Sequence, residues 1–169
     1  RLKKAVFNTA IIGESQDLHV GQFIDRIGVA LGLGFPAGKE LEGLAETCYR
    51  SELRFPSVVR DCYVSFSGPE TAAQRAIQSG KYSKEEIAWA VLDCISRSIY
   101  KLVLNCLKKS EATNLLFIGG VAGNKYLRTY LQQRLNRTGK NLKLFFAEPA
   151  YSSDNAVGVA LLGLECVQH

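Results

Sequence analysis

A short apolar run that ends in two glycines constrains this chain most, because it predicts a strand, a tight turn and a helix in direct succession. The run covers residues 115–118, Gly119 and Gly120 follow it, and a helical pattern begins at Val121. Glycines can take positive φ and let a ligand approach the backbone, and the first turn of a helix offers free N–H groups. The stretch matches neither the dinucleotide fingerprint nor a P-loop. It therefore predicts an anion-binding turn or an ordinary strand-to-helix connection of an α/β protein.

The rest of the chain carries an alternation of strand and helix patterns, which indicates an α/β fold. The patterns predict strands over 5–12, 114–118 and 142–146, a strand or hairpin over 57–66, and helices over 18–33, 39–49, 69–79, 84–109, 121–136 and 154–167. The strand–helix–strand–helix order at the end favours a parallel βαβα unit. We expect a single lobe over 1–169, with a sheet-and-helix core in 1–16 and 110–169 and a largely helical insertion over about 17–109.

Composition narrows the class of protein. The 169 residues are 47% hydrophobic and 22% charged, as in an ordinary globular domain with a real core. Five single cysteines without a C-x-x-C pair indicate free thiols in a reducing, cytoplasmic setting. No apolar run approaches the ~20 residues that span a bilayer, so we expect no membrane partner. The sequence begins at Arg1, so we expect a fragment or a processed form.

The basic residues gather in one stretch. Between Glu111 and Glu148 there is no acid, and the cations are Lys125, Arg128, Arg134, Arg137, Lys140 and Lys143. This basic stretch, 125–143, is either a footprint for a nucleic-acid phosphate backbone or simply a solvated helix face and loop.

Two acidic residues stand out from the helical patterns. Asp25 shares a face of the first predicted helix with Gly21, Gly28 and Gly32, so another helix or a ligand packs closely there. Asp154 precedes a helix that is apolar nearly all round, where it is either a capping residue or a carboxylate that binds a metal or phosphate.

Several of these stretches agree with one family. They are Ser15–Arg26 continuing into Leu31–Gly38, the Ser-Phe-Ser-Gly element Ser65–Gly68, the glycine turn Gly119–Arg128, and Ser152–Ala156. Their order and residues resemble the tRNA threonylcarbamoyladenosine transferases, formerly called O-sialoglycoprotein endopeptidases or glycoproteases. The resemblance implies the C-terminal lobe of an actin/Hsp70-like (ribonuclease H-like) ATPase fold.

The resemblance also implies roles for particular residues. Asp25 and Gly38 would contact an adenylate or ATP-type nucleotide, together with Asn124 at the turn formed by Gly119 and Gly120. Asp154 would be one ligand of an iron or zinc ion, with two histidines of a His-x-x-x-His motif as its partners. The threonylcarbamoyl group would pass from the adenylate to N6 of an adenosine in tRNA, which the basic stretch could contact.

The sequence also departs from the family pattern. Histidines occur only at positions 19 and 169, so no His-x-x-x-His is present, and the resemblance assigns that motif to an N-terminal lobe that would be the partner of this chain. Leu18 and Gln22 replace two acids, and Glu70 stands where lysine is usual. We therefore expect the chain alone to be inactive. Two alternatives stay open: a non-catalytic paralogue that forms a homo- or heterodimer with a same-fold protein, and a kinase relative.

Overall fold

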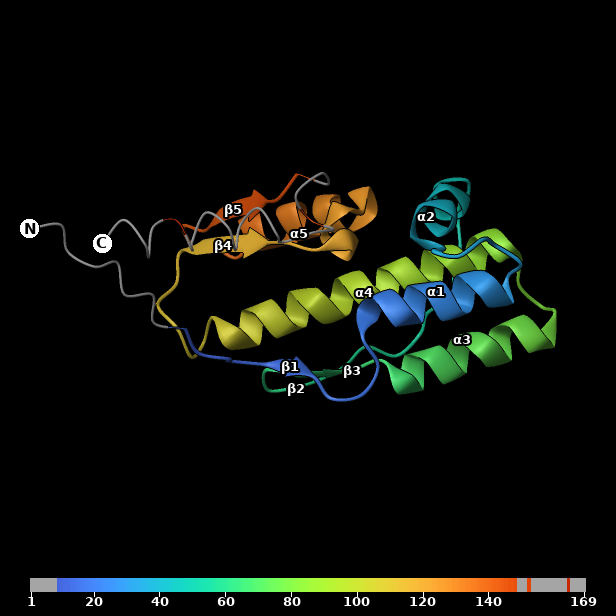
Figure 1. Ribbon diagram of the computed structural model, residues 1–169, viewed down its shortest axis with the longest axis horizontal. Coiled ribbons are helices and arrows are strands. Elements are labelled where there is room, and N and C mark those ends of the chain that lie inside the picture. The colour runs from blue at the N-terminus through green and yellow to red at the C-terminus, as the bar shows by residue number, and fades with distance from the viewer. Residues whose placement is uncertain (1–8, 149–151, 153–163, 165–169) are drawn as a thin grey trace, which may run out of the picture.

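The structure, a computed structural model, describes residues 9–148, Ser152 and Leu164. One long helix, α4, runs through the centre of this part of the chain, with the other elements arranged on either side of it (Figure 1). The helices are α1 (Val20–Ala30), α2 (Gly38–Glu46), α3 (Ser67–Ser79), α4 (Lys84–Cys106) and α5 (Lys125–Asn136), with a short 3-10 helix, η1 (Gly120–Gly123), before α5.

Two small sheets accompany the helices. In the first, β1 (Glu14–Ser15) pairs in parallel with β3 (Tyr63–Ser65), and β2 (Val58–Arg60) pairs antiparallel with β3. In the second, β4 (Asn114–Phe117) and β5 (Lys143–Phe146) are parallel, with Leu115 opposite Leu144. The described chain is thus an α/β structure of helices and small sheets, and its segment 57–66 forms a hairpin.

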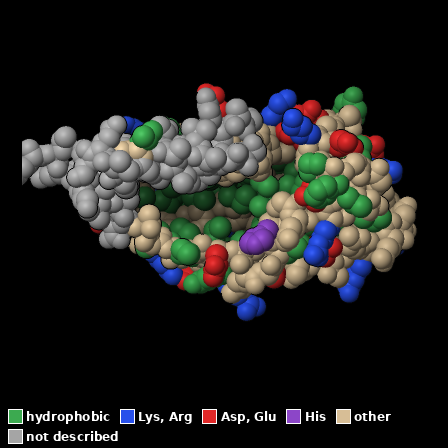
Figure 2. Space-filling model, viewed as in Figure 1, with side chains coloured by type: hydrophobic (Ala, Val, Ile, Leu, Met, Phe, Trp, Pro, Cys, Tyr) green, Lys and Arg blue, Asp and Glu red, His purple; other side chains and the backbone are tan. Residues whose placement is uncertain are grey.

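The helix α4 joins two hydrophobic cores. Its first part packs with α1, α2 and α3 around fully buried residues such as Phe23, Leu41 and Val91. Its last part packs against α5, whose Leu131 and Leu135 are completely buried beneath the inner face of the β4–β5 sheet. In the space-filling view, a hollow with hydrophobic side chains on its floor opens over α4, between these two parts (Figure 2). The central helix therefore fixes the spacing of the two parts.

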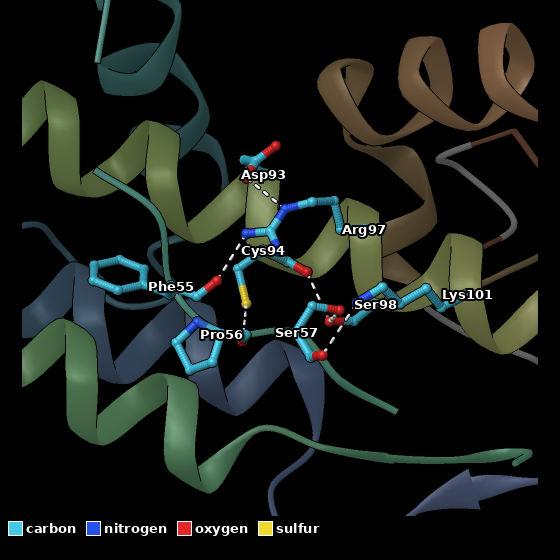
Figure 3. A network of polar contacts seen from close by, with 8 residues as sticks. All are labelled: Phe55, Pro56, Ser57, Asp93, Cys94, Arg97, Ser98 and Lys101. Carbon is cyan, nitrogen blue, oxygen red and sulfur yellow. Dashed lines mark hydrogen bonds and ion pairs between the residues drawn. The ribbon is translucent and has the colours of Figure 1, made fainter. Parts of the chain in front are cut away.

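The loop before β2 is tied to the middle of α4 by side-chain hydrogen bonds (Figure 3). Arg97 forms a 2.7 Å ion pair with Asp93 and donates a second bond, of 2.8 Å, to the carbonyl oxygen of Phe55. The next residue of α4, Ser98, donates a hydrogen bond of 2.9 Å from its hydroxyl to that of Ser57. These contacts attach an irregular segment to the helix that organises the fold.

The sequence Ser83-Lys84-Glu85-Glu86 predicts a capping box at the start of α4, and the structure confirms it. The backbone N–H of Ser83 donates to the Glu86 carboxylate at 2.9 Å, and the N–H of Glu86 donates to the Ser83 hydroxyl at 3.2 Å. Two backbone donors that would lack a partner at the helix N-terminus are satisfied in this way.

Three predicted boundaries near the N-terminus are wrong. Residues 9–12 are not in a strand, and the strand begins only after Gly13. The helix predicted over 18–33, for which Asp17 is the N-cap that the sequence predicts, begins at Val20 with His19 as its N-cap. The Asp17 carboxylate instead binds the segment Ser65–Ser67. The helix ends at Ala30, because Gly32 takes a left-handed conformation with φ of 86° that no helix interior accepts.

The division of the chain at residues 16 and 110 into a core and an insertion stays a prediction. Residues Glu14–Ser15 pair with β3, inside the expected insertion, whereas β4 and β5 form a sheet of their own. The predicted helix 154–167 lies outside the described residues except for Leu164, which is helical. Among the helices that the structure describes, none is both long and apolar enough to cross a membrane.

Candidate functional site

The glycine turn after β4 is built as a strand-to-helix connection with open space beside it. Gly119 has φ of 98°, a conformation that favours glycine, and a Cβ added at Gly119 or Gly120 would meet none of the described atoms within 4 Å. The helix predicted to start at Val121 is instead the 3-10 turn η1 followed by α5. Asn124, which is 8% exposed, separates the two and caps α5 by accepting the Leu127 N–H at 2.9 Å.

A carboxylate from another helix already occupies the N-terminus of α5. The Oε1 atom of Glu42, in α2, accepts a 2.6 Å hydrogen bond from the backbone N–H of Lys125. This contact joins residues 83 positions apart and brings α2 to the glycine turn. Glu42 is not among the residues that the sequence motifs indicate, although its position one helical turn after Gly38 is a signal that the two residues share a face of α2.

Asp25, in α1, contacts the residue that directly precedes α2. Its Oδ1 atom accepts the backbone N–H of Ala37 at 2.9 Å, directly before Gly38 begins α2. Beside Gly38, an added Cβ would find no described atom within 4 Å, so the backbone is open to a ligand there. The first residues of α2 thus lie between Asp25 and the start of α5.

Gly28 allows α1 to pack closely against the residue that precedes α2. A Cβ at Gly28 would lie only 2.2 Å from the Cβ of Ala37, a separation that two such atoms never adopt. On the same face, a Cβ at Gly21 would lie 4.0 Å from Val121 in η1. Of the two explanations for this glycine face, close packing within the protein accounts for Gly28, whereas a Cβ at Gly21 would make only ordinary van der Waals contact. Gly32 does not share the explanation, because it lies beyond the helix end.

A pocket of about 340 Å³ opens next to Asp25, between α1 and α3. Most of its surface is apolar, but two carboxylates reach it from different helices. The lining residues are Asp25, Arg26, Val29, Phe35, Glu70 and Gln74. Glu70 accepts a 3.3 Å hydrogen bond from the Gln74 side-chain amide, so its carboxylate is held at the pocket wall. Phe35 is 78% exposed, which leaves an aromatic face available at the rim.

Asp17 holds the Ser-Phe-Ser-Gly element against the entry to α1. Its carboxylate accepts hydrogen bonds from the hydroxyls of Ser65 and Ser67 at 2.6 and 2.5 Å, and from the backbone N–H groups of Phe66 and Leu18 at 2.9 and 2.6 Å. Partial burial opposes ionisation of this carboxyl, but the four hydrogen bonds outweigh it and hold the pKa of Asp17 well below its usual range. The element that begins α3 is therefore fixed by an ionised side chain.

The proposed metal ligand Asp154 lies outside the described residues. Within the ranges that the structure describes, no three His, Cys, Asp or Glu side chains gather closely enough to hold a metal ion. The described residues therefore do not form a metal site by themselves.

The basic stretch contains five exposed cations and one cation that is hydrogen-bonded within the protein. Lys125, Arg134, Arg137, Lys140 and Lys143 are exposed, whereas Arg128 is half-buried and donates to two backbone carbonyl groups. The guanidinium of Arg134 also stacks 5.4 Å from the centre of the Tyr130 ring. Five of the six charges remain at the surface.

The structure therefore brings some of the predicted site residues together. Through α2, Asp25 and Gly38 are connected to the helix that follows Gly119, Gly120 and Asn124.

Comparison with protein families agrees with the motifs. The family model described as tRNA N6-adenosine threonylcarbamoyltransferase matches residues 3–161. Proteins of that name from Wolbachia pipientis wMel and Chlamydia caviae are 30% and 34% identical to this chain and cover 93% and 92% of it. One from Thermococcus sibiricus is 30% identical over 91% of the chain. The chain spans about half the length of these relatives, 47% to 49%.

Two solved structures share the arrangement of the elements. The crystal structure of T. kodakarensis HypF superposes on 88% of this chain with a TM-score of 0.66 and 20% identity, and the match covers 20% of that protein. Full-length HypF in a phosphate- and nucleotide-bound form superposes on 76% of this chain with a TM-score of 0.60 and 19% identity, over 18% of its own length. At such identity the likeness is one of fold. Since the family model covers nearly the whole sequence, this chain belongs to the tRNA N6-adenosine threonylcarbamoyltransferase family.

Proposed function

We propose that this chain forms one side of an adenylate-binding cleft in a protein that transfers a threonylcarbamoyl group to N6 of an adenosine in tRNA. The observation that carries the proposal is the position of α2, whose N-cap residue Ala37 contacts Asp25 and whose Glu42 contacts the start of α5. An open backbone, a carboxylate and a helix N-terminus are the groups that a nucleotide's ribose and phosphates require. The fold that best accounts for this arrangement is the C-terminal lobe of an actin/Hsp70-like ATPase.

The site residues would have separate tasks. Asp25 uses Oδ1 to hold Ala37, so Oδ2 would accept the ribose hydroxyls, and the open backbone at Gly38 would let the nucleotide approach. Asn124 uses Oδ1 as a cap, so its Nδ2 group would donate to the ligand. Backbone groups of Gly119 and Gly120 would line the phosphate end. The Glu42 carboxylate at the α5 N-terminus would then either accept a hydrogen bond from the nucleotide or lie next to its phosphate.

An iron or zinc ion would be held in part by Asp154, which supplies one ligand from this chain, and would polarise the oxygens of the bound adenylate. Its other ligands would come from an N-terminal lobe, the expected partner of this chain. We therefore assign the residues described above to binding and orientation, and we expect the chain on its own not to catalyse transfer.

The tRNA would contact the exposed part of the basic stretch. The five surface cations between Lys125 and Lys143 lie in a segment without acids, which favours a phosphate backbone. Such binding would weaken linearly with the logarithm of salt concentration. Because the modification acts on tRNA, we place the protein in the cytoplasm.

A second function is favoured by Glu70. This carboxylate lines the same pocket as Asp25, at the position where the family pattern has lysine. Two carboxylates around one pocket repel an anionic ligand, which suits a non-catalytic paralogue that acts as a dimerisation partner. A kinase relative of the same fold is the remaining alternative.

The test is titration of the complete gene product with AMP-PNP, followed by an assay for threonylcarbamoyl transfer to tRNA and for metal content. Asp25→Asn keeps an oxygen for the Ala37 N–H, so we expect nearly unchanged stability and an affinity about tenfold lower, the loss of roughly one charge-assisted hydrogen bond. Glu52→Gln, at a fully exposed position, is the control. A wild-type protein that binds no nucleotide would support the paralogue, and nucleotide-dependent phosphorylation of a small substrate would support the kinase.

A further inference from the structure

The side chain of Arg128 joins three separate pieces of the candidate site. Its Nε atom donates to the carbonyl oxygen of Ala122 in η1 at 2.6 Å, and its Nη2 atom donates to the carbonyl oxygen of Ala147 at 2.6 Å. The guanidinium carbon lies 5.3 Å from the centre of the Phe146 ring. One side chain on α5 therefore reaches both the glycine turn and the residue that follows β5.

The strand ends are also tied to each other at this point. The Ala147 N–H donates to the carbonyl oxygen of Phe117 at 2.9 Å, and the rings of Phe117 and Phe146 stack with centres 4.8 Å apart. The carboxyl ends of neighbouring parallel strands are where α/β proteins bind their ligands. Arg128 thus links the ends of β4 and β5 to the η1 turn that leads to Asn124.

The geometry requires the fork of a guanidinium. Two carbonyl groups from different segments each take a separate N–H of one planar group, which a lysine ammonium on a flexible stem does not reproduce. Among the described residues Arg128 is not paired with any carboxylate, so its partners are the two backbone carbonyl groups and the aromatic face.

We propose that Arg128 is a positioning residue that sets the geometry of the Gly119–Asn124 turn relative to the end of β5. It acts through Ala122 and Ala147 and does not itself touch the nucleotide or the tRNA. The expected effect of Arg128 on nucleotide binding rests on the proposed adenylate site. Its effect on the turn does not, because the contacts are present in the protein without ligand. These contacts also remove Arg128 from the cations of the basic stretch that are available to nucleic acid.

The test compares Arg128→Lys and Arg128→Gln with the wild type in the complete gene product. Amide hydrogen exchange reports on the turn directly, because the N–H groups of Ala122 and Asn124 form its internal hydrogen bonds, of 3.0 and 3.1 Å. We expect both variants to raise the exchange rates of these two amides by about tenfold while the core amides of α4 keep theirs. Arg60→Lys, an exposed arginine on β2, is the control and should change neither.

Nucleotide affinity gives the second readout. If Arg128 positions the turn, both variants weaken AMP-PNP binding about tenfold, although lysine keeps the charge. An Arg128→Lys protein that exchanges and binds like the wild type would overturn the proposal, because charge alone would then suffice. Should the wild type bind no AMP-PNP, the adenylate proposal fails, and the exchange rates alone still decide whether Arg128 holds the turn.

Discussion

The hydroxyl of Ser65 donates a 2.6 Å hydrogen bond to the carboxylate of Asp17, which lies 48 residues earlier in the chain. This contact, with those from Ser67 and Phe66, attaches the start of α3 to the segment that enters α1. The pocket beside Asp25 lies between these two helices, so its width depends on the attachment.

Removing the Asp17 carboxylate should destabilise the fold without changing the packing of either hydrophobic core. We expect Asp17→Ala to lower the free energy of unfolding by about 1–2 kcal/mol, since several charge-assisted hydrogen bonds are lost at a largely solvated position. Urea denaturation measures the change, and Glu52→Ala serves as the exposed control. A loss no larger than that of the control would show that the attachment does not hold α3.

The same carboxylate should make stability depend on pH in acid. The pKa of Asp17 lies well below its usual range in the folded protein, so the folded state binds fewer protons than the unfolded state. Its contribution is present above the ordinary carboxyl pKa of about 4 and is lost as the pH falls through the lower folded value. Between about pH 4.5 and pH 2, the wild type should therefore lose stability more steeply than Asp17→Asn, and parallel curves would contradict the assignment.

The contact between α1 and the start of α2 should not tolerate a methyl group. Gly28→Ala places a Cβ 2.2 Å from that of Ala37, and both atoms are fixed by the backbone, so we expect a loss of about 1–3 kcal/mol. Gly43→Ala, inside α2 with open space beside it in the described structure, should instead add about 0.5–1 kcal/mol through helix propensity. Thermal melting of both variants tests the pair, and equal effects would refute the close contact.

Two serines of α4 should respond oppositely to alanine. The hydroxyl of Ser96 is buried and has no hydrogen-bond partner in the described chain, whereas that of Ser98 bonds to Ser57 and to the carbonyl oxygen of Cys94. Ser96→Ala removes an unsatisfied polar group and should stabilise by about 0.5–1 kcal/mol, while Ser98→Ala should cost about 1 kcal/mol. If both variants lose stability, the Ser96 hydroxyl stabilises the fold and the prediction is wrong.

Local signals in the sequence were sufficient where the structure depends on neighbouring residues. The pair Ser83 and Glu86 predicted a capping box, and an apolar run before Gly119 predicted a strand and a turn, because these features involve residues a few positions apart. Gly32 shows the limit of local pattern, since a glycine with helical spacing turned out to end the helix through its positive φ.

The contacts that bring the site together could not be predicted in this way. Glu42 meets Lys125 across 83 residues, and Asp17 meets Ser67 across 50. Such pairs are fixed by the packing of α1, α2 and α3 on α4. The hydrophobic periodicity of a sequence does not predict which helix surfaces pack against each other. The resemblance to a family identified Asp25, Gly38 and Asn124 as candidates, but the part of α2 in connecting them became visible only in three dimensions.

Two glycines of α2 allow a direct test of the proposed adenylate site. Neither has a described atom within 4 Å of an added Cβ, but Gly38 borders the proposed nucleotide and Gly43 does not. Gly38→Ala and Gly43→Ala should both fold with a free energy of unfolding within about 1 kcal/mol of the wild type. In calorimetric titrations of the complete gene product with AMP-PNP, we expect Gly38→Ala to weaken binding at least tenfold and Gly43→Ala to leave it unchanged. Equal affinities for the two variants would contradict an adenylate site at the start of α2.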